Sequence, residues 1–272
     1  MEQDLPAPYY CQDGITIYNA DCLDLLPRLS GFDCVVMDPP YASGARSEAS
    51  RTSSGAMVRG ARWNTKPMAN DQMTTTGFVW MLRAACFGFY EALPPGGGVL
   101  SFIDWRQWPN LLGAVESVNL RVNGMVVWDK ELMGLGNGFR AQHELILFAS
   151  KGVPEVFDLG SSNVIRQARV GNDDHPAAKP PALLRALLAV VCPPTGTVLD
   201  AFMGGGSTLL AAKQTGRQAI GVELSEEHCE TAAKRLAQSE LFSHPSPRAL
   251  DVGASPPGLG ILEEQRKTKG DG

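Results

Sequence analysis

Short apolar segments alternate with amphipathic segments along most of this chain. Apolar runs that stop at turn-forming residues predict strands at 15–18, 33–37, 99–103, 121–128, 144–149, 198–202 and 218–222. Between most of these strands, apolar residues at helical spacing predict helices at 23–29, 78–89, 105–117, 183–191, 208–214 and 226–238. Strands that alternate with helices in this way indicate an α/β fold with a mostly parallel sheet.

One pair of predicted strands departs from this alternation. The segment between 121–128 and 144–149 contains several glycines and is too short for a crossover helix. We therefore expect these two strands to pair antiparallel, as a hairpin at the edge of the sheet. Two other stretches, 42–72 and 151–174, show little periodicity, which is typical of long loops that serve in binding.

Length and composition indicate one domain. The chain has 272 residues, of which 44% are apolar, enough to bury one sizeable core. Beyond Phe242 the composition shifts to serine, proline, glycine and charged residues. We assign residues 1–242 to the domain and expect 243–272 to be a disordered tail.

Charge and cysteine usage narrow the class of protein. The net charge of −5 provides no overall positive field for nucleic acid, although 42–70 holds five basic residues against one acidic residue. The six cysteines and four histidines lack the short paired spacings of metal or redox sites, so we expect no metal. Free cysteines, no signal-like segment and no apolar stretch that could span a bilayer favour a cytoplasmic protein.

The predicted strand 33–37 runs directly into Asp38-Pro39-Pro40-Tyr41. Proline has no N–H for the sheet ladder and fixes φ, so the strand stops at this point. It delivers a carboxylate, a rigid turn and an aromatic ring to the carboxyl edge of the sheet, where open α/β sheets bind ligands. The tetrapeptide is therefore a candidate catalytic motif.

A second candidate motif follows the strand 198–202. Asp200 precedes a turn with three successive glycines, 204–206, and the next strand ends at Glu223. This is the layout of a site for an adenosine-containing cofactor, because glycines admit the ligand and the second carboxylate can accept both ribose hydroxyls. Leu209 occupies the place of the third glycine of a dinucleotide motif, and Asp200 would repel a pyrophosphate. S-adenosylmethionine, which carries a cationic amino-acid moiety, fits better than NAD.

Taken together, five segments resemble the DNA amino-methyltransferases that modify exocyclic nitrogens, in the subgroup whose Asp-Pro-Pro-Tyr precedes the glycine-rich turn (the β group). The matching segments are 20–26, 38–41, 128–147, 175–180 and 200–208 with 221–223, and they follow the order of the family. The resemblance implies a Rossmann-like methyltransferase sheet that is circularly permuted, with the catalytic half before the cofactor half. The strand before Asp21 would then lie beside the strand that ends at Glu223.

The resemblance also implies roles for individual residues. A target base would be flipped out of the duplex and stacked on Tyr41, while Asp38 and the Pro39 carbonyl accept its amino hydrogens. The implied catalytic set is Asp38, Pro39, Pro40 and Tyr41. The residues implied to bind S-adenosyl-L-methionine are Asp21, Cys22, His175, Lys179, Asp200, Phe202, Gly204, Gly206, Thr208 and Glu223. Among these, Lys179 is expected at the carboxylate of the cofactor and Glu223 at its ribose hydroxyls.

DNA is the expected partner, and the protein is expected to be a monomer or a homodimer. Aspartate rather than serine before Pro-Pro-Tyr favours N6 of adenine over N4 of cytosine by resemblance. Cytosine N4, RNA, a protein glutamine and a non-catalytic cofactor-binding DNA module stay open as alternatives. The candidate DNA contacts are Arg59, Arg62 and Trp63, with 151–174 as a second recognition segment. Arg140 and Glu144 are candidates for the catalytic cleft, but we favour their interpretation as an ion pair that fixes the predicted hairpin.

Overall fold

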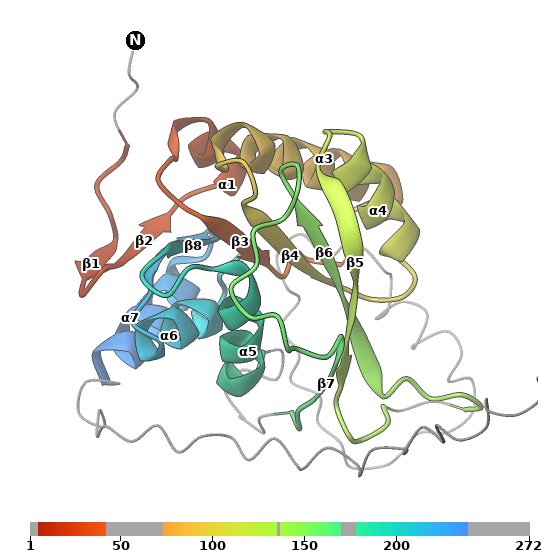
Figure 1. Ribbon diagram of the computed structural model, residues 1–272. Helices are drawn as coiled ribbons and strands as arrows, with labels where there is room; N and C mark the ends of the chain where they lie inside the picture. Colours follow the sequence, from red (N-terminus) through yellow and green to blue (C-terminus); the bar gives the residue numbers. More distant parts are fainter. Residues whose placement is uncertain (1–4, 42–72, 135–136, 170–177, 239–272) are drawn as a thin grey trace, which may run out of the picture. The chain divides into compact units, whose positions relative to one another are not determined.

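A single mixed sheet organises the part of the chain that the structure describes (Figure 1). The computed structural model describes residues 5–41, 73–134, 137–169 and 178–238. The strands are β1 (Tyr10–Gln12), β2 (Ile15–Asn19), β3 (Cys34–Met37), β4 (Gly98–Ile103), β5 (Arg121–Asp129), β6 (His143–Ser150), β7 (Val164–Arg166), β8 (Thr197–Asp200) and β9 (Gln218–Glu223). The helices are α1 (Cys22–Leu25), the 3-10 turn η1 (Leu26–Arg28), α3 (Thr75–Ala92), α4 (Trp108–Glu116), α5 (Pro181–Val191), α6 (Ser207–Gln214) and α7 (Glu226–Gln238). Every strand and helix predicted from the sequence is present, with ends that differ by a few residues.

The strand order brings the strand before Asp21 beside the strand that ends at Glu223, as the resemblance implied. Across the sheet the strands lie in the order β1, β2, β9, β8, β3, β4, β6, β5, β7. The run from β2 to β4 is parallel throughout. Asn19 of β2 lies opposite Glu223 of β9, although the two residues are 204 positions apart in the chain. This confirms that the first and last parts of the domain meet in the sheet.

The predicted antiparallel hairpin is β5 with β6. The strand that runs against the others, β6, lies between β4 and β5 and pairs antiparallel with both. Its residues Leu145, Ile146 and Leu147 are buried, as an interior strand requires, whereas β5 is largely half-exposed. Two short strands were not predicted. β1 pairs with β2, and β7, within the segment expected to be irregular, pairs with β5 and lies outside the hairpin.

Helices cover both faces of the sheet (Figure 1). The strand β3 shows why, because its alternate residues enter two different apolar clusters. Val35 and Met37 pack in the cluster that includes α1, α3 and α4. Cys34 and Val36 pack in the cluster that includes α5, α6 and α7. Burial of β3 on both faces fixes the direction in which the strand leaves the sheet.

The carboxyl ends of the central parallel strands carry a row of acidic residues. Each strand ends at an acidic residue or is followed by one within two positions: Asp21 after β2, Glu223 in β9, Asp200 in β8, Asp38 after β3 and Asp104 after β4. Because parallel strands end at the same edge, these side chains gather where an open α/β sheet binds ligands.

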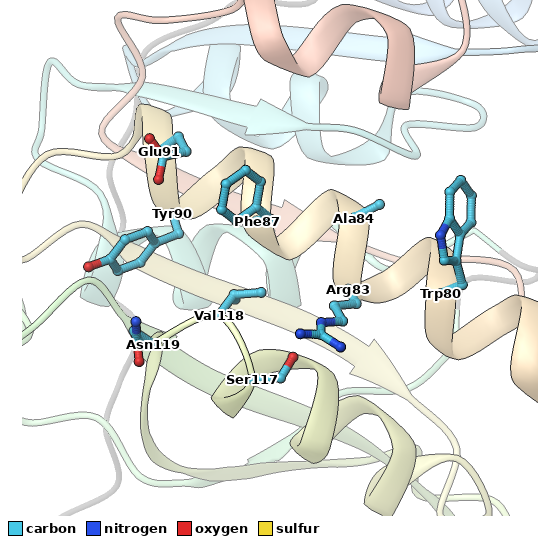
Figure 2. A pocket seen from close by; sticks show the side chains of 9 residues that line it. All are labelled: Trp80, Arg83, Ala84, Phe87, Tyr90, Glu91, Ser117, Val118 and Asn119. Carbon is cyan, nitrogen blue, oxygen red and sulfur yellow. The ribbon is translucent and has the colours of Figure 1, made fainter.

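The longest helix of the described residues, α3, packs one face in the core and exposes large side chains on the other. Thr74 caps the helix by accepting a hydrogen bond from the N–H of Gly77 at 3.2 Å. Its inner face buries Phe78, Leu82 and Phe89, while large side chains on its outer face and the turn after α4 line a hollow of about 570 Å³ (Figure 2). None of the predicted site residues lines this hollow. No helix in the described ranges has both the length and the hydropathy that crossing a bilayer requires.

Candidate active site

The carboxylate of Asp38 lies at the carboxyl edge of the sheet, directly after β3. The hydroxyl of Tyr41 donates a hydrogen bond to Asp38 Oδ1 at 2.5 Å, and Lys179 Nζ donates one to Oδ2 at 2.6 Å. The Asp38 side chain is 31% exposed, so it remains accessible to a ligand. Pro39 and Pro40 prevent the strand from continuing, and the turn that they form contains the hydrogen bond between Tyr41 and Asp38.

Two residues of the β5–β6 hairpin complete the surroundings of Asp38. Glu144 Oε1 lies 2.8 Å from the Tyr41 hydroxyl and 2.9 Å from Lys179 Nζ. Glu144 Oε2 lies 2.6 Å from Lys130 Nζ. We call Asp38, Tyr41, Lys130, Glu144 and Lys179 the charged cluster. Four separate parts of the chain supply it: the turn after β3, the end of β5, the start of β6 and the residue two before α5.

The pKa values of the charged cluster show which protonation states it holds. Burial would raise the pKa of Glu144, but the ammonium groups of Lys179 and Lys130 outweigh burial and lower it to about 2. Burial would lower the pKa of Lys179, but Asp38 and Glu144 outweigh it and raise that pKa. Burial and the same two carboxylates raise the pKa of Tyr41 well above its usual range. At neutral pH Glu144 is therefore an anion, Lys179 a cation and Tyr41 a neutral hydroxyl.

A second hollow, of about 180 Å³, opens beside the charged cluster. Tyr41, Lys130 and Glu144 line one part of it, and Trp105 and Arg106, which follow β4, line another. The Trp105 side chain is 58% exposed, and the Arg106 guanidinium lies 4.8 Å from its ring centroid. The hollow thus offers aromatic surface, hydrogen-bonding groups and positive charge next to Asp38.

The glycine-rich turn lies at the ends of β8 and β9. Gly204 and Gly206 both have a left-handed backbone, with φ of 48° and 74°. Glu223 Oε2 accepts a hydrogen bond from the N–H of Gly204 at 3.0 Å, and Oε1 accepts one from the N–H of Ser225 at 2.8 Å. These bonds fix the Glu223 carboxylate at the mouth of the turn.

The two left-handed glycines differ in their surroundings. A Cβ on Gly206 would lie 2.8 Å from Cβ of Ala232 in α7, so this position requires glycine for packing as well as for its backbone. A Cβ on Gly204 would meet nothing within 4 Å. The backbone at Gly204 therefore borders open space, as close approach of a ligand requires.

Asp200 ends β8, which lies between β9 and β3 in the sheet and leads into the glycine-rich turn. Its side chain is buried, with 4% of its surface exposed, and accepts a hydrogen bond from the N–H of Phe202 at 3.1 Å. Burial is the main cause that raises the pKa of Asp200 to about 7; hydrogen bonds from Thr208 and from the N–H of Phe202 oppose the rise, and the charges of Asp38 and Glu223 contribute to it. A cationic group near Asp200 would stabilise its ionised form.

The residues at the end of β2 and just after it lie beside the end of β9. Asp21 caps α1 by accepting a hydrogen bond from the N–H of Leu23 at 2.9 Å. The Cys22 thiol is buried, and burial together with Asp21 raises its pKa to about 12. Asn19 was not predicted as a site residue. Its Nδ2 donates to the carbonyl oxygens of Glu223 and Leu224, each at 3.0 Å, and so joins the ends of β2 and β9.

Comparison with known proteins shows the family to which the chain belongs. Residues 32–234 match the N6/N4 DNA methylase family. The chain belongs to this DNA methylase family. It is 34% identical to the type II methyltransferase M.ScaI of Streptomyces caespitosus, over 87% of this chain and 86% of the relative. It is 28% identical to the putative methylase YubD of Escherichia coli K12, over 86% of this chain and 92% of the relative.

A likeness to solved structures confirms the fold. The crystal structure of the M1.HpyAVI–SAM complex superposes with a TM-score of 0.61 at 22% identity, over 82% of this chain and 99% of that chain. The DNA methylase described here is thus an S-adenosylmethionine-dependent methyltransferase of Rossmann-like fold, as the sequence led us to expect.

The structure of this DNA methylase brings most of the predicted site residues to one edge of the sheet. Those placed there are Asp21, Cys22, Asp38, Pro39, Pro40, Tyr41, Lys179, Asp200, Phe202, Gly204, Gly206, Thr208 and Glu223. His175, Arg59, Arg62 and Trp63 lie outside the described residues. Within the described ranges, no three His, Cys, Asp or Glu side chains gather as a metal site would require.

Two hairpin residues differ from their predicted pairing. Arg140 Nε donates to the carbonyl of Gly134 at 2.6 Å, whereas Glu144 contacts Lys130 and Lys179. The predicted ion pair between Arg140 and Glu144 is therefore wrong, because the register of the hairpin directs Glu144 toward Asp38. The sequence offered one signal for this, the acidic residue at the start of an otherwise apolar strand that is buried on both faces.

Proposed function

We propose that this DNA methylase transfers a methyl group from S-adenosyl-L-methionine to N6 of an adenine flipped out of double-stranded DNA. The observation that carries the proposal is the position of Asp38. It follows β3, the neighbour of β8, which leads into the glycine-rich turn, and it is hydrogen-bonded to Tyr41, which lines the hollow of about 180 Å³. The order of the two motifs, with Asp-Pro-Pro-Tyr first, supports the proposal that the protein belongs to the β group.

The cofactor would occupy the ends of β8, β9 and β2. Glu223 would accept the ribose hydroxyls; the hydrogen bonds to its carboxylate from the N–H groups of Gly204 and Ser225, which fix its orientation, support this role. Asp21 and Cys22 would border the adenine, and Phe202 and Thr208 would complete the wall near the turn. Asp200 suits a cationic ligand, because its ionised form is costly until a positive group approaches. The role of His175, outside the described residues, stays a prediction from the sequence.

The target base would stack on Tyr41, in the hollow that Trp105 also lines. The amino nitrogen of adenine is a poor nucleophile, because its lone pair is delocalised into the ring. Asp38 and the Pro39 carbonyl would accept the two amino hydrogens and so favour a nitrogen whose lone pair is free to react. When bound, the cofactor supplies the methyl group from its sulfonium. The nitrogen gains that methyl and loses one proton, for which the Asp38 carboxylate is the acceptor at hand.

Positioning and electrostatics would supply most of the rate in this reaction. Lys179 orients the Asp38 carboxylate through its bond of 2.6 Å to Oδ2. DNA contacts are assigned to the basic stretch 42–72, with Arg59, Arg62 and Trp63, and to 151–174. The described part of the latter contains β7, which extends the sheet beyond the hairpin.

The proposal is tested by mass spectrometry of nucleosides from unmethylated bacterial DNA, after incubation with the protein and S-adenosylmethionine. We expect N6-methyladenine. N4-methylcytosine instead would contradict the assignment of the base and favour the alternative that the family also contains. No methylated base, with cofactor binding confirmed by calorimetry, would contradict the proposed DNA methylation and favour RNA, protein or a non-catalytic role.

A further inference from the structure

The contacts of Glu144 are more than a structural ion pair requires. Its Oε1 is shared by the two groups that also contact Asp38, with the Tyr41 hydroxyl at 2.8 Å and Lys179 Nζ at 2.9 Å. Its Oε2 is held by Lys130 at 2.6 Å. The Glu144 side chain is only 11% exposed, so water replaces few of these contacts.

The Tyr41 hydroxyl lies between two carboxylates but carries one hydrogen. It is 2.5 Å from Asp38 Oδ1 and 2.8 Å from Glu144 Oε1, and it can donate to only one of them at a time. Its hydrogen can change acceptor by rotation about the C–O bond, without movement of the ring. The Lys179 ammonium, with three hydrogens, contacts both carboxylates at once.

Both oxygens of Asp38 therefore hold a donor: Tyr41 at Oδ1 and Lys179 at Oδ2. An amino group that approaches Asp38 must compete with these donors. If Tyr41 turned its hydrogen to Glu144, Oδ1 would become a free acceptor while the ring stayed in place. Glu144 would also draw part of the Lys179 charge away from Asp38 and leave Asp38 a stronger acceptor.

We propose that Glu144 is a positioning residue for methyl transfer: it is the alternative acceptor for the Tyr41 hydroxyl and the Lys179 ammonium, and it thereby frees Asp38 for the amino group of the target base. Glu144 also lines the hollow proposed for the base, but in this scheme it acts through Tyr41 and Lys179 and accepts no hydrogen from the amino group. Its low pKa, which the ammonium groups of Lys179 and Lys130 produce in spite of burial, keeps it ionised at every pH at which the enzyme would be assayed. The inference rests on the proposed function, because it requires Asp38 to be the acceptor.

The first test is the substitution Glu144→Gln, which keeps the shape of the side chain and removes its charge. Tyr41 and Lys179 then both turn to Asp38, so we expect kcat to fall roughly 10- to 100-fold, the range for loss of a hydrogen bond to a charged group. KM for DNA and Kd for S-adenosylmethionine should change less than about threefold. The matched control is Asp129→Asn, which removes a carboxylate from the opposite strand of the hairpin, in register with His143. This control should keep kcat within about twofold.

A double-mutant cycle with Tyr41→Phe separates positioning from a structural role. Without the hydroxyl, Asp38 Oδ1 is free whether or not Glu144 is charged, so Glu144→Gln should cost at least threefold less in this background, as expected for coupled residues. Glu144→Asp, which keeps the charge, should be less impaired than Glu144→Gln and serves in its place if the glutamine variant does not fold. Equal cost in both backgrounds, or an unchanged kcat, would overturn the inference.

Asp38→Ala, measured alongside, distinguishes this failure from failure of the proposed function. An inactive Asp38→Ala with a fully active Glu144→Gln contradicts only the role of Glu144. An active Asp38→Ala contradicts the proposed function, and the role of Glu144 with it.

Discussion

Asp200 gives a prediction in which stability and cofactor binding have opposite signs. Its pKa rises from the ordinary 3.8 to about 7 in the folded protein, because the carboxyl is buried. Folding therefore takes up a proton between these pH values. The stability that this carboxyl contributes is complete below about pH 4, falls as the pH rises, and is lost above about pH 7. A difference of about three in pKa corresponds to about 4 kcal/mol.

The substitution Asp200→Asn removes this dependence on pH. Asparagine is neutral at every pH and its carbonyl can still accept the hydrogen bond from the N–H of Phe202, although its amide N–H₂ costs about 1 kcal/mol if it finds no acceptor. At pH 8 the variant should therefore be about 3 kcal/mol more stable than the natural protein. Because the carboxyl titrates near pH 7, this advantage should grow by about 3 kcal/mol between pH 5 and pH 8.

Urea unfolding at pH 5 and pH 8 measures both quantities. Titration calorimetry should show that the same substitution weakens the binding of S-adenosylmethionine at pH 8, because the variant cannot present a negative charge to a cationic ligand. Two results would refute the assignment of a buried carboxyl with a raised pKa. One is a variant that is no more stable than the natural protein at pH 8, and the other is a stability difference that is the same at both pH values. A gain in stability at the expense of binding would instead mark Asp200 as a functional residue.

Three further predictions concern other parts of the site. Gly206→Ala should destabilise the protein by about 2 kcal/mol or more, because the new methyl would clash with α7 and the backbone is left-handed. Gly204→Ala, which has only the left-handed backbone against it, should cost about 1 kcal/mol. Thermal unfolding that ranks the two variants in the opposite order would contradict this packing of Gly206 against α7. Lys179→Met should lower kcat about tenfold or more and change Kd for S-adenosylmethionine less than about threefold, because it removes the cation that Asp38 and Glu144 share and that orients Asp38. A large loss of cofactor affinity measured by calorimetry would instead support the cofactor carboxylate as the partner of Lys179. Replacement of Arg59 and Arg62 by alanine should weaken DNA binding and reduce the slope of log K against log salt by about one for each lost phosphate contact, and an unchanged slope in fluorescence anisotropy would exclude 42–72 as a DNA contact.

Most of the sheet, and the edge at which its parallel strands end in acidic residues, could be predicted because local signals determine them. The strand β3 is marked by four apolar residues and two prolines, and β8 with β9 by glycines between two short apolar runs. The pairing of β2 with β9 required more, since no local rule joins residues 204 positions apart, and it came from the order of the family motifs. The strands β1 and β7 have three residues each, too few for periodicity to mark them.

The charged cluster could not be predicted for a related reason. Lys179 and Asp38 are 141 positions apart, and Glu144 reaches both only through the register of the β5–β6 hairpin. A one-residue change of that register would direct Glu144 to the other face of the sheet. The sequence identified the residue types at this edge of the sheet, whereas the assignment of partners, Glu144 to two lysines rather than to Arg140, required the three-dimensional structure.

The central claim is that Asp38 is the acceptor that makes the amino nitrogen of adenine reactive. Its most direct test is the single-turnover rate of N6-methyladenine formation by Asp38→Ala, compared with Asp33→Ala, which removes a carboxylate from the opposite end of the same strand. We expect Asp38→Ala to bind S-adenosylmethionine with a Kd within about threefold of the natural protein and to lose roughly 10³-fold or more in rate, while Asp33→Ala retains most of its rate. Near-normal methylation by Asp38→Ala, with the cofactor bound, would contradict this account of the site.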